Sequence, residues 1–297
     1  MKENNTTKSY ILIISSMLIF GTIGVFRRYI PLSSGMLAFI RGVVGSLFLL
    51  GFVKIKGIKM GKDIDKKSLI LTIISGGFIG INWILLFEAF NYTTVATATL
   101  CYYMQPTIVI FLSQLILKEK LVVKKVICAI ISIIGMLFVA GVIDAGNAPS
   151  IADLRGVFLG LGAAAFYSAV VMLNKMIHIE NAYTKTIIQL SSAAIILIPY
   201  LIANGEFGIM ISGENINSFA IVMILIVGII HTGIAYAMYF GSMNNLKAQS
   251  IAIMSYIDPV FALILSDVVL HEKMTIFGII GAVLILGSAL ISEIEKI

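Results

Sequence analysis

Two stretches of this chain follow one pattern. Residues 80–120 read GINWILLFEAFNYTTVATATLCYYMQPTIVIFLSQLILKEK, and residues 233–273 read GIAYAMYFGSMNNLKAQSIAIMSYIDPVFALILSDVVLHEK. They align without a gap at an offset of 153, and 11 of the 41 pairs are identical. Both copies hold a proline in mid-stretch, Pro106 or Pro259, and both finish with Leu-x-Glu-Lys. A proline and a charged pair in one register indicate an internal repeat rather than the chance similarity of apolar helices.

The composition places both copies in a membrane. Of 297 residues, 59% are hydrophobic and 12% are charged, and the mean hydropathy is +1.04. A soluble domain is roughly half apolar and about a quarter charged. A bilayer removes the need for a polar surface. Spans of about 20 residues, each followed by a short loop, fit into this length about ten times. We predict an all-α membrane protein of ten transmembrane helices, near residues 9–26, 35–53, 68–90, 94–117, 121–141, 154–174, 183–203, 218–240, 248–270 and 274–292.

The repeat sets the expected domain organisation. The offset of 153 divides the chain into two repeats, and each repeat holds five predicted spans. Because five is odd, the second repeat enters the membrane from the opposite side. We therefore predict two inverted five-helix repeats, residues 1–145 and 146–297. Inverted repeats with a site near the midplane are a recurring plan of secondary transporters, because the two halves can exchange roles between inward-open and outward-open states.

Lysine and arginine set the expected direction in the membrane. With the amino terminus inside, the inside segments hold 16 of the 21 basic residues, and Arg41 lies within the second span. The outside segments hold four, namely Arg27, Arg28, Arg155 and Lys273. Basic residues favour the cytoplasmic side, so we predict a multi-pass protein of the bacterial cytoplasmic membrane with both termini cytoplasmic. The net charge of +6 then reflects topology, with the lipid bilayer and not nucleic acid as the partner.

The chain resembles the EamA-type transporters of the drug/metabolite transporter superfamily over nearly its whole length. Phe20-Gly21-Thr22 stands where that family has Trp-Gly-Ser/Asn, so Phe20 replaces a tryptophan, and Arg41 stands at the family's arginine in the second span. The other matching motifs are Tyr92-Thr93-Thr94-Val95-Ala96, Pro106, Leu117-x-Glu119-Lys120, Pro259 and Leu270-x-Glu272-Lys273. The resemblance implies ten helices, a central cavity lined mainly by spans 1–4 and 6–9, and export of small metabolites, often amino acids.

Ionisable side chains inside the spans are functional candidates, because charge in a bilayer is costly. Arg41 could bind a substrate carboxylate through two parallel hydrogen bonds, or pair with groups of the protein. Asp258, at the middle of the ninth span, could carry a coupling proton or attract an ammonium group; the alternative is a carboxyl that is neutral or satisfied by Ser255. Its repeat partner, Gln105, cannot titrate. His231 could join a proton relay or act as a neutral hydrogen-bond partner.

Pro106 and Pro259 each remove a backbone hydrogen bond in mid-span. We expect helix breaks that expose polar backbone to a cavity, with a static kink as the alternative. Polar and aromatic residues of neighbouring spans could line that cavity, or form interhelical hydrogen bonds instead. The predicted substrate contacts are Arg41, Asn82, Trp83, Tyr102, Tyr103, Gln105, Tyr167, Gln189, Tyr236, Tyr239 and Tyr256.

Other matched positions predict structural contacts. Glu119 and Glu272 close the fourth and ninth spans, and we expect each to form a cap or a salt bridge. Two Gly-x-x-x-Gly motifs, at 76–80 and 156–160, predict close helix packing without a ligand. Cys101 and Cys128 fall within apolar runs and are expected to be free thiols.

These features together predict a secondary transporter that moves a small-molecule substrate by alternating access. An exporter of metabolites such as amino acids, with protons as a candidate coupling ion, is the leading hypothesis. A facilitative channel, or a broad exporter of drugs or nucleosides, is the alternative; a channel needs a continuous polar pore. The sequence shows no catalytic constellation, metal spacing, cofactor motif or ATP-binding loop, so we predict neither an enzyme nor a metal or cofactor site.

Overall fold

The computed structural model of the chain describes residues 2–61, 64–118, 122–140, 150–179, 181–208, 217–243, 246 and 254–293. These residues form helices joined by turns, and no strand occurs among them. The predicted all-α class is therefore confirmed. Seven helices or runs of consecutive helices in the described ranges are long and apolar enough to cross a membrane.

The seven spans coincide with the first four predicted spans and with the sixth to the eighth. Some are single helices and others are broken within the span. They are α1 (Lys2–Gly21) with α2 (Ile23–Arg28), α3 (Ser34–Ile55), α4 (Lys66–Tyr92), α5 (Val95–Tyr102) with α6 (Gln105–Leu117), α8 (Ile151–Met176), α9 (Ala182–Ala203), and α11 (Ser218–Ile226) with the π-helix η1 (Val227–Ile234) and α12 (Ala235–Met243).

The three other predicted spans contain shorter helices. They are α7 (Val123–Val139), α14 (Ile257–Val268) and α15 (Ile276–Glu293), and none of them is among the seven spans. Residues 247–253, at the start of the ninth predicted span, lie outside the described residues. The count of ten spans therefore stays a prediction.

Polar caps fix where several helices begin. A side-chain oxygen at the N-cap accepts a hydrogen bond from a backbone amide in the first turn, which satisfies a group that the helix leaves unpaired. Ser150 and Asp153 form a full capping box at the start of α8. Single caps of the same kind are provided by Ser33, Asp65, Thr94, Asn181 and Asn217.

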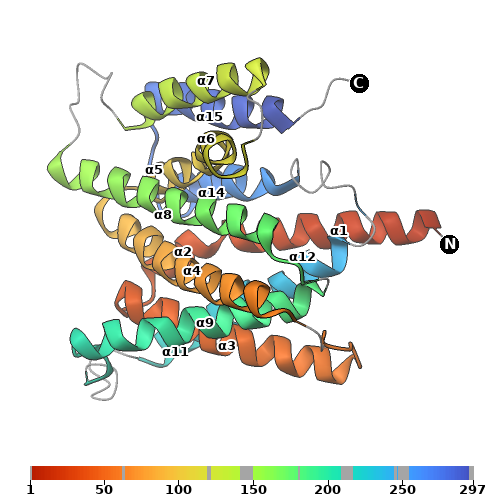
Figure 1. Cartoon of the computed structure of the whole chain (residues 1–297). Helices are drawn as coiled ribbons and strands as arrows, with labels where there is room; N and C mark the ends of the chain where they lie inside the picture. The colour runs from red at the N-terminus through yellow and green to blue at the C-terminus, as the bar shows by residue number, and fades with distance from the viewer. Residues whose placement is uncertain are drawn as a thin grey trace.

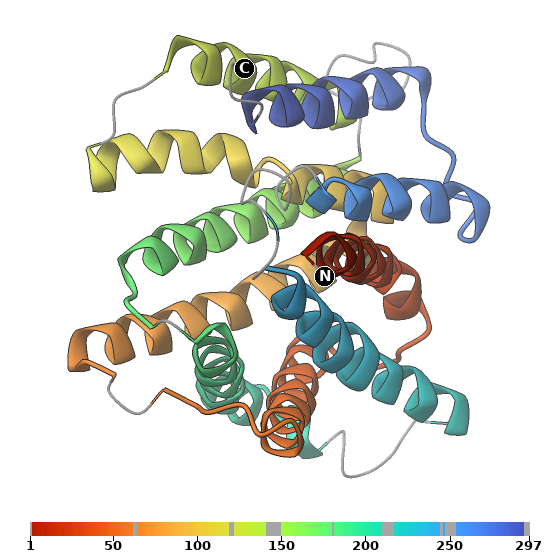
Figure 2. The same cartoon turned by 90° about the vertical axis from the view of Figure 1, so that its right-hand side faces the viewer.

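The helices pack in layers (Figures 1 and 2). α4 packs against α8 and α9, and α3 packs against α9 and η1. α7 and α15 lie side by side along one edge of the bundle (Figure 1). Gly135 and Gly281 let that pair approach closely, since a Cβ at Gly135 would lie 2.8 Å from the carbonyl oxygen of Gly281. The Gly76 motif serves the same purpose where α4 meets α9: a Cβ at Gly76 would press on Ser192.

Two charged residues near helix ends have clear partners. Glu272 forms the predicted salt bridge, at 2.5 Å to Arg28, and also accepts hydrogen bonds from the Val95 amide and Ser266. Its expected counterpart, Glu119, lies outside the described residues. Arg27 differs from expectation: the predicted boundary of the first span placed it in a loop, but α2 carries it into a buried position.

Nearby acceptors explain the burial of Arg27. Its guanidinium donates to the carbonyl of Ile30 at 3.0 Å, to Ser34 Oγ at 3.3 Å and to Asn91 Oδ1 at 3.4 Å. These bonds satisfy much of the guanidinium without solvent, so the helix can extend past the hydropathy boundary.

Candidate functional site

Arg41 lies in the first half of α3 with 6% of its surface exposed. Its guanidinium carbon lies 4.3 Å from the centre of the Trp83 ring and 5.7 Å from that of Phe87, both on α4, in cation–π contacts. Its Nε donates a 2.9 Å hydrogen bond to Thr232 Oγ1 on η1. Within the described residues, neither Nη has a hydrogen-bond partner and neither is fully enclosed. The two nitrogens that bind a carboxylate side by side are therefore available.

Asp258 is the second residue of α14 and is half-buried. Its Oδ2 accepts a 2.8 Å hydrogen bond from the Tyr103 hydroxyl, which lies 155 residues away in the chain. The partner is thus on another helix; Ser255, one turn away, was the neighbour considered from the sequence. This bond joins the two segments that contain the mid-span prolines.

Both prolines lie just after an interruption of a helix. α5 ends at Tyr102, α6 begins at Gln105, and Pro106 falls in the first turn of α6. In the other segment, a turn at Tyr256 precedes α14, and Pro259 falls in its first turn. Because proline lacks an amide hydrogen, it fits the first turn of a helix but not its interior. Tyr103 lies in the interruption between α5 and α6, and Asp258 lies in the first turn of α14, directly after the other interruption.

A group of tyrosines surrounds this contact. The Tyr102 ring lies 5.7 Å from both Tyr103 and Tyr167, and Tyr103 lies 6.4 Å from Tyr256. Tyr236 is close enough to interact electrostatically with Tyr102 and Tyr167. Each ring is half-buried, so each keeps part of its surface accessible. We call these five tyrosines, at 102, 103, 167, 236 and 256, the tyrosine cluster.

The two charged residues flank the tyrosine cluster. Arg41 lies within electrostatic range of Tyr102, Tyr236 and Asp258. Asp258 and Arg41 nevertheless form no ion pair. Among the described residues, the one salt bridge joins Arg28 to Glu272. The arrangement presents one cation and one acid to the same rings without letting them neutralise each other directly. Tyr239 lies near the cluster, within electrostatic range of Tyr167 and Tyr236.

Other predicted site residues contact neighbouring helices instead. Asn82 is buried and donates a 2.7 Å hydrogen bond to the carbonyl of Ala163 on α8. Gln189 donates to Ser75 Oγ at 2.7 Å and to Asn174 Oδ1 at 3.1 Å. Such bonds between helices satisfy polar groups away from water, and they are the structural alternative considered for these amides.

Gln105 and His231 lie at the borders of the site. Gln105 is half-buried at the start of α6, and its backbone carbonyl accepts a 3.1 Å hydrogen bond from Ser168 Oγ. His231 is buried in η1, its Nε2 lies 2.6 Å from Thr22 Oγ1, and its ring meets Phe26 edge-on at 4.8 Å. A role for His231 in coupling stays a prediction.

The π-helix η1 positions Thr232, a partner of Arg41 that was not among the predicted contacts. Thr232 Oγ1 also donates to the Val227 carbonyl five residues earlier, the spacing of a π-helix. A Cβ added at Gly45 of α3 would clash with the Thr232 side chain, so this glycine brings α3 close to η1. The sequence gave no sign that Thr232 would lie opposite Gly45 of α3.

The fold and the buried polar residues define a polytopic membrane protein with a charged, aromatic interior. The chain belongs to the EamA-like transporter family, whose sequence pattern matches residues 7–141 and again residues 154–293. The resemblance noted from the sequence is thereby confirmed, and the protein is a membrane transporter.

Relatives of known sequence carry the same description. The uncharacterized transporter YxxF of Bacillus subtilis (strain 168) is 32% identical over 298 residues, which cover 99% of this chain and 92% of that protein. An uncharacterized transporter of Clostridium kluyveri is 26% identical over 96% of this chain and 93% of its own length. A crystal structure of a protein with 15% identity matches with a TM-score of 0.63 over 97% of both chains, which supports the fold alone.

Proposed function

We propose that this protein is a secondary transporter, of the exporter type, that moves amino acids or similarly small zwitterions across the bacterial cytoplasmic membrane by alternating access. The observation that carries the proposal is the pair of opposite charges on the tyrosine cluster. Arg41 offers two unpartnered nitrogens, and Asp258 accepts a hydrogen bond from Tyr103 of the cluster and forms no ion pair with Arg41.

A zwitterion complements this arrangement. Its carboxylate would accept two parallel hydrogen bonds from Arg41, a geometry that lysine cannot supply. Its ammonium group would approach Asp258 and the faces of the tyrosine rings, which attract cations. The remaining half-buried ring surface would cover an apolar side chain, as in other small-molecule sites.

Alternating access rests on two inverted five-helix repeats, residues 1–145 and 146–297. Helix positions support the repeat: α7 begins at Val123 and α15 begins 153 residues later, at Ile276. Lys118 and His271, also 153 apart, have φ angles of 55° and 56°, and within the described ranges they are the non-glycine residues with positive φ. The equivalent residues Tyr103 and Tyr256 meet at the centre of the site.

The pairing of helices also supports the repeat. Contact of α4 with α9 corresponds to contact of η1 with α3 when the two repeats exchange places, and contact of α4 with α8 corresponds to contact of α12 with α1. All four contacts join the first repeat to the second. The amino-terminal end of α1 and the carboxyl-terminal end of α15 lie at the same end of the bundle (Figure 1). This agrees with an even number of spans, which places both termini on one side of the membrane.

Asp258 is the group that would couple substrate to protons. A proton and the substrate's ammonium group would compete for the same carboxylate, so protonation on one side would release the substrate and deprotonation would permit binding. This competition yields exchange of one for the other without a second acidic site. Gln105, the repeat equivalent of Asp258, would remain neutral throughout.

The first test uses a reporter that the chain already contains. Trp83 is the single tryptophan, and Arg41 stacks on its ring, so a ligand bound to Arg41 should alter its fluorescence. We would titrate the purified protein with amino acids, with their decarboxylated amines and with their deaminated acids. Loss of one charged hydrogen-bonding group costs about 1.5–3 kcal/mol, so either analogue should bind roughly 10- to 150-fold more weakly.

Each outcome of the titration has a meaning. Amines that bind as tightly as amino acids would exclude the carboxylate role of Arg41 and favour a broad drug exporter. No response to any amino acid from folded protein would exclude this substrate class and direct the search to nucleosides. Counterflow in proteoliposomes then tests coupling: Asp258→Asn should abolish acceleration by a proton gradient, whereas Asp267→Asn, on the same helix but exposed, should not.

A further inference from the structure

The end of α3 folds the following loop back against the helix. Gly57 adopts the left-handed conformation, with φ of 64°, and its amide donates to the Lys54 carbonyl at 3.2 Å. The amide of Ile58 donates to the Val53 carbonyl at 3.0 Å. These two bonds and the glycine form a Schellman motif, in which the residue after the glycine packs against the last helical turn.

The loop is then fixed on α9. Asn181 Nδ2 donates to the Lys59 carbonyl at 3.0 Å, and the Gly61 amide donates to Thr184 Oγ1 at 3.2 Å. The loop therefore has a defined path between α3 and α9. Hydrogen bonds therefore hold the loop in place at both of its ends, against α3 and against α9.

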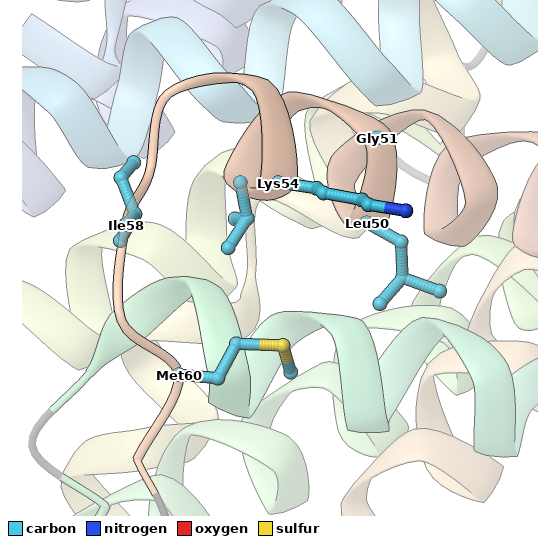
Figure 3. A pocket seen from close by; sticks show the side chains of 6 residues that line it. Leu50, Gly51, Lys54, Ile58 and Met60 are labelled. Atoms are coloured by element: carbon cyan, nitrogen blue, oxygen red, sulfur yellow. The ribbon is translucent and has the colours of Figure 1, made fainter.

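A groove of about 420 Å³ lies between this loop and α3 (Figure 3). None of the candidate substrate contacts lines it. Gly51 opens the groove, because a Cβ at this position would meet nothing within 4 Å. The lining consists of Leu50, Gly51, Val53, Lys54, Ile58 and Met60.

The chemistry of the groove is that of an acyl chain beside an anion. Leu50 and Met60 are 38% and 39% exposed, and they approach the groove from opposite sides (Figure 3). Lys54 is exposed and has no hydrogen-bond or ion-pair partner in the part of the chain that the structure describes. It opens a run of six lysines and two aspartates between residues 54 and 67. One of these acids, Asp65, is engaged in capping α4.

We propose that this groove is a binding site for an anionic phospholipid, with an acyl chain along the apolar lining and the phosphate at Lys54. The position fits, because α3 is long and apolar enough to cross a membrane, so its end should lie near the headgroups. The charge also fits, because basic clusters next to a membrane span attract anionic lipids. The site is separate from the proposed substrate site and depends only on the protein being in a membrane.

The test compares lipids that differ in headgroup alone. Delipidated full-length protein would be titrated with dioleoyl phosphatidylglycerol or dioleoyl phosphatidylcholine, and binding would be followed by native mass spectrometry. We expect phosphatidylglycerol to bind more tightly, and Lys54→Gln to weaken it about fivefold while leaving phosphatidylcholine unchanged. Gly51→Leu should weaken both lipids by filling the groove. Gly287→Leu is the matched control, since a Cβ there also meets nothing within 4 Å.

Three results would overturn the proposal. Equal binding of the two lipids would exclude a headgroup site. An unchanged affinity for phosphatidylglycerol in both Lys54→Gln and Gly51→Leu would place the lipid elsewhere. Displacement of the lipid by millimolar glycerol phosphate would show a site for a free anion, with no role for the apolar groove. Lys54 is exposed, so the Lys54→Gln variant should fold and give a decisive result if Gly51→Leu does not.

Discussion

Replacing Arg41 by lysine should weaken amino-acid binding much more than it weakens the fold. Lysine keeps the charge but offers a single ammonium nitrogen, so one of two parallel hydrogen bonds to the carboxylate is lost. A hydrogen bond to a charged group contributes about 1.5–3 kcal/mol. The dissociation constant should therefore rise roughly 10- to 150-fold, as measured from the fluorescence of Trp83.

A second variant separates orientation from charge. Thr232→Val keeps the shape of the side chain but removes the 2.9 Å hydrogen bond that orients Arg41. Thr232 orients Arg41 but does not contact the substrate, so its loss should cost substrate binding only about 1 kcal/mol, or about fivefold in the dissociation constant. Arg155→Lys is the matched control, because Arg155 also stacks on a ring, that of Tyr92 at 4.2 Å, but is not among the predicted site residues.

A purely structural role for Arg41 would give a different result. In that case Arg41→Lys would lower the melting temperature and leave the dissociation constant of every amino acid within twofold of wild type. The proposed role of Arg41 in binding would also be refuted if Thr232→Val weakened binding more than Arg41→Lys, because an orienting bond cannot contribute more than the group that it orients. Melting curves of all three variants, recorded in one detergent, provide the comparison.

Three predictions concern stability, measured as thermal unfolding of purified protein. A double-mutant cycle of Arg28→Met and Glu272→Gln should give a coupling of about 0.2–1 kcal/mol that falls in high salt, since the pair is partly exposed; no coupling would make it incidental. Hydrogen bonds with the first turn of α4 hold the pKa of Asp65 below its ordinary 3.8. The stabilising effect of Asp65 is therefore present above pH 3.8 and is lost as the pH falls through the lowered pKa. Between about pH 5 and 3, Asp65→Asn should lose less stability than the wild type. Gly76→Leu should cost about 1–3 kcal/mol by overpacking against α9, whereas Gly287→Leu should be neutral.

The positions of the helices could be predicted from the sequence because the bilayer imposes a length on each apolar segment. Seven predicted spans match helices of span length, and the mid-span prolines lie next to real interruptions. The salt bridge of Glu272 was also within reach, because the residue closes an apolar run. These features depend on local sequence or on the membrane, and not on how helices are rotated against each other.

Side-chain partners were harder to predict for a physical reason. Lipid tails are as apolar as the protein interior, so the apolar pattern says little about which face of a helix meets its neighbour. Gln189 and Asn82 were expected in the cavity but pair with other helices. The hydrogen bond between Thr232 and Arg41 was not predicted, because a π-helix shifts the register of its side chains by one residue and the composition gives no sign of this.

The placement of charge has a consequence for transport that follows from the proposed repeats. In these proposed repeats Arg41 lies in the first half and Asp258 in the second, and the repeat equivalent of Asp258 is Gln105. A zwitterion that bridges Arg41 and Asp258 therefore joins the two halves, and its binding energy depends on how they are arranged. A ligand shifts a conformational equilibrium only through such a difference in affinity between states. An amine or an acid engages only one of the two charged residues, so it lacks the charge pairing that joins Arg41 to Asp258. It should therefore exchange more slowly than an amino acid at equal occupancy, in the same proteoliposomes, and equal rates would show that bridging plays no part in the conformational change.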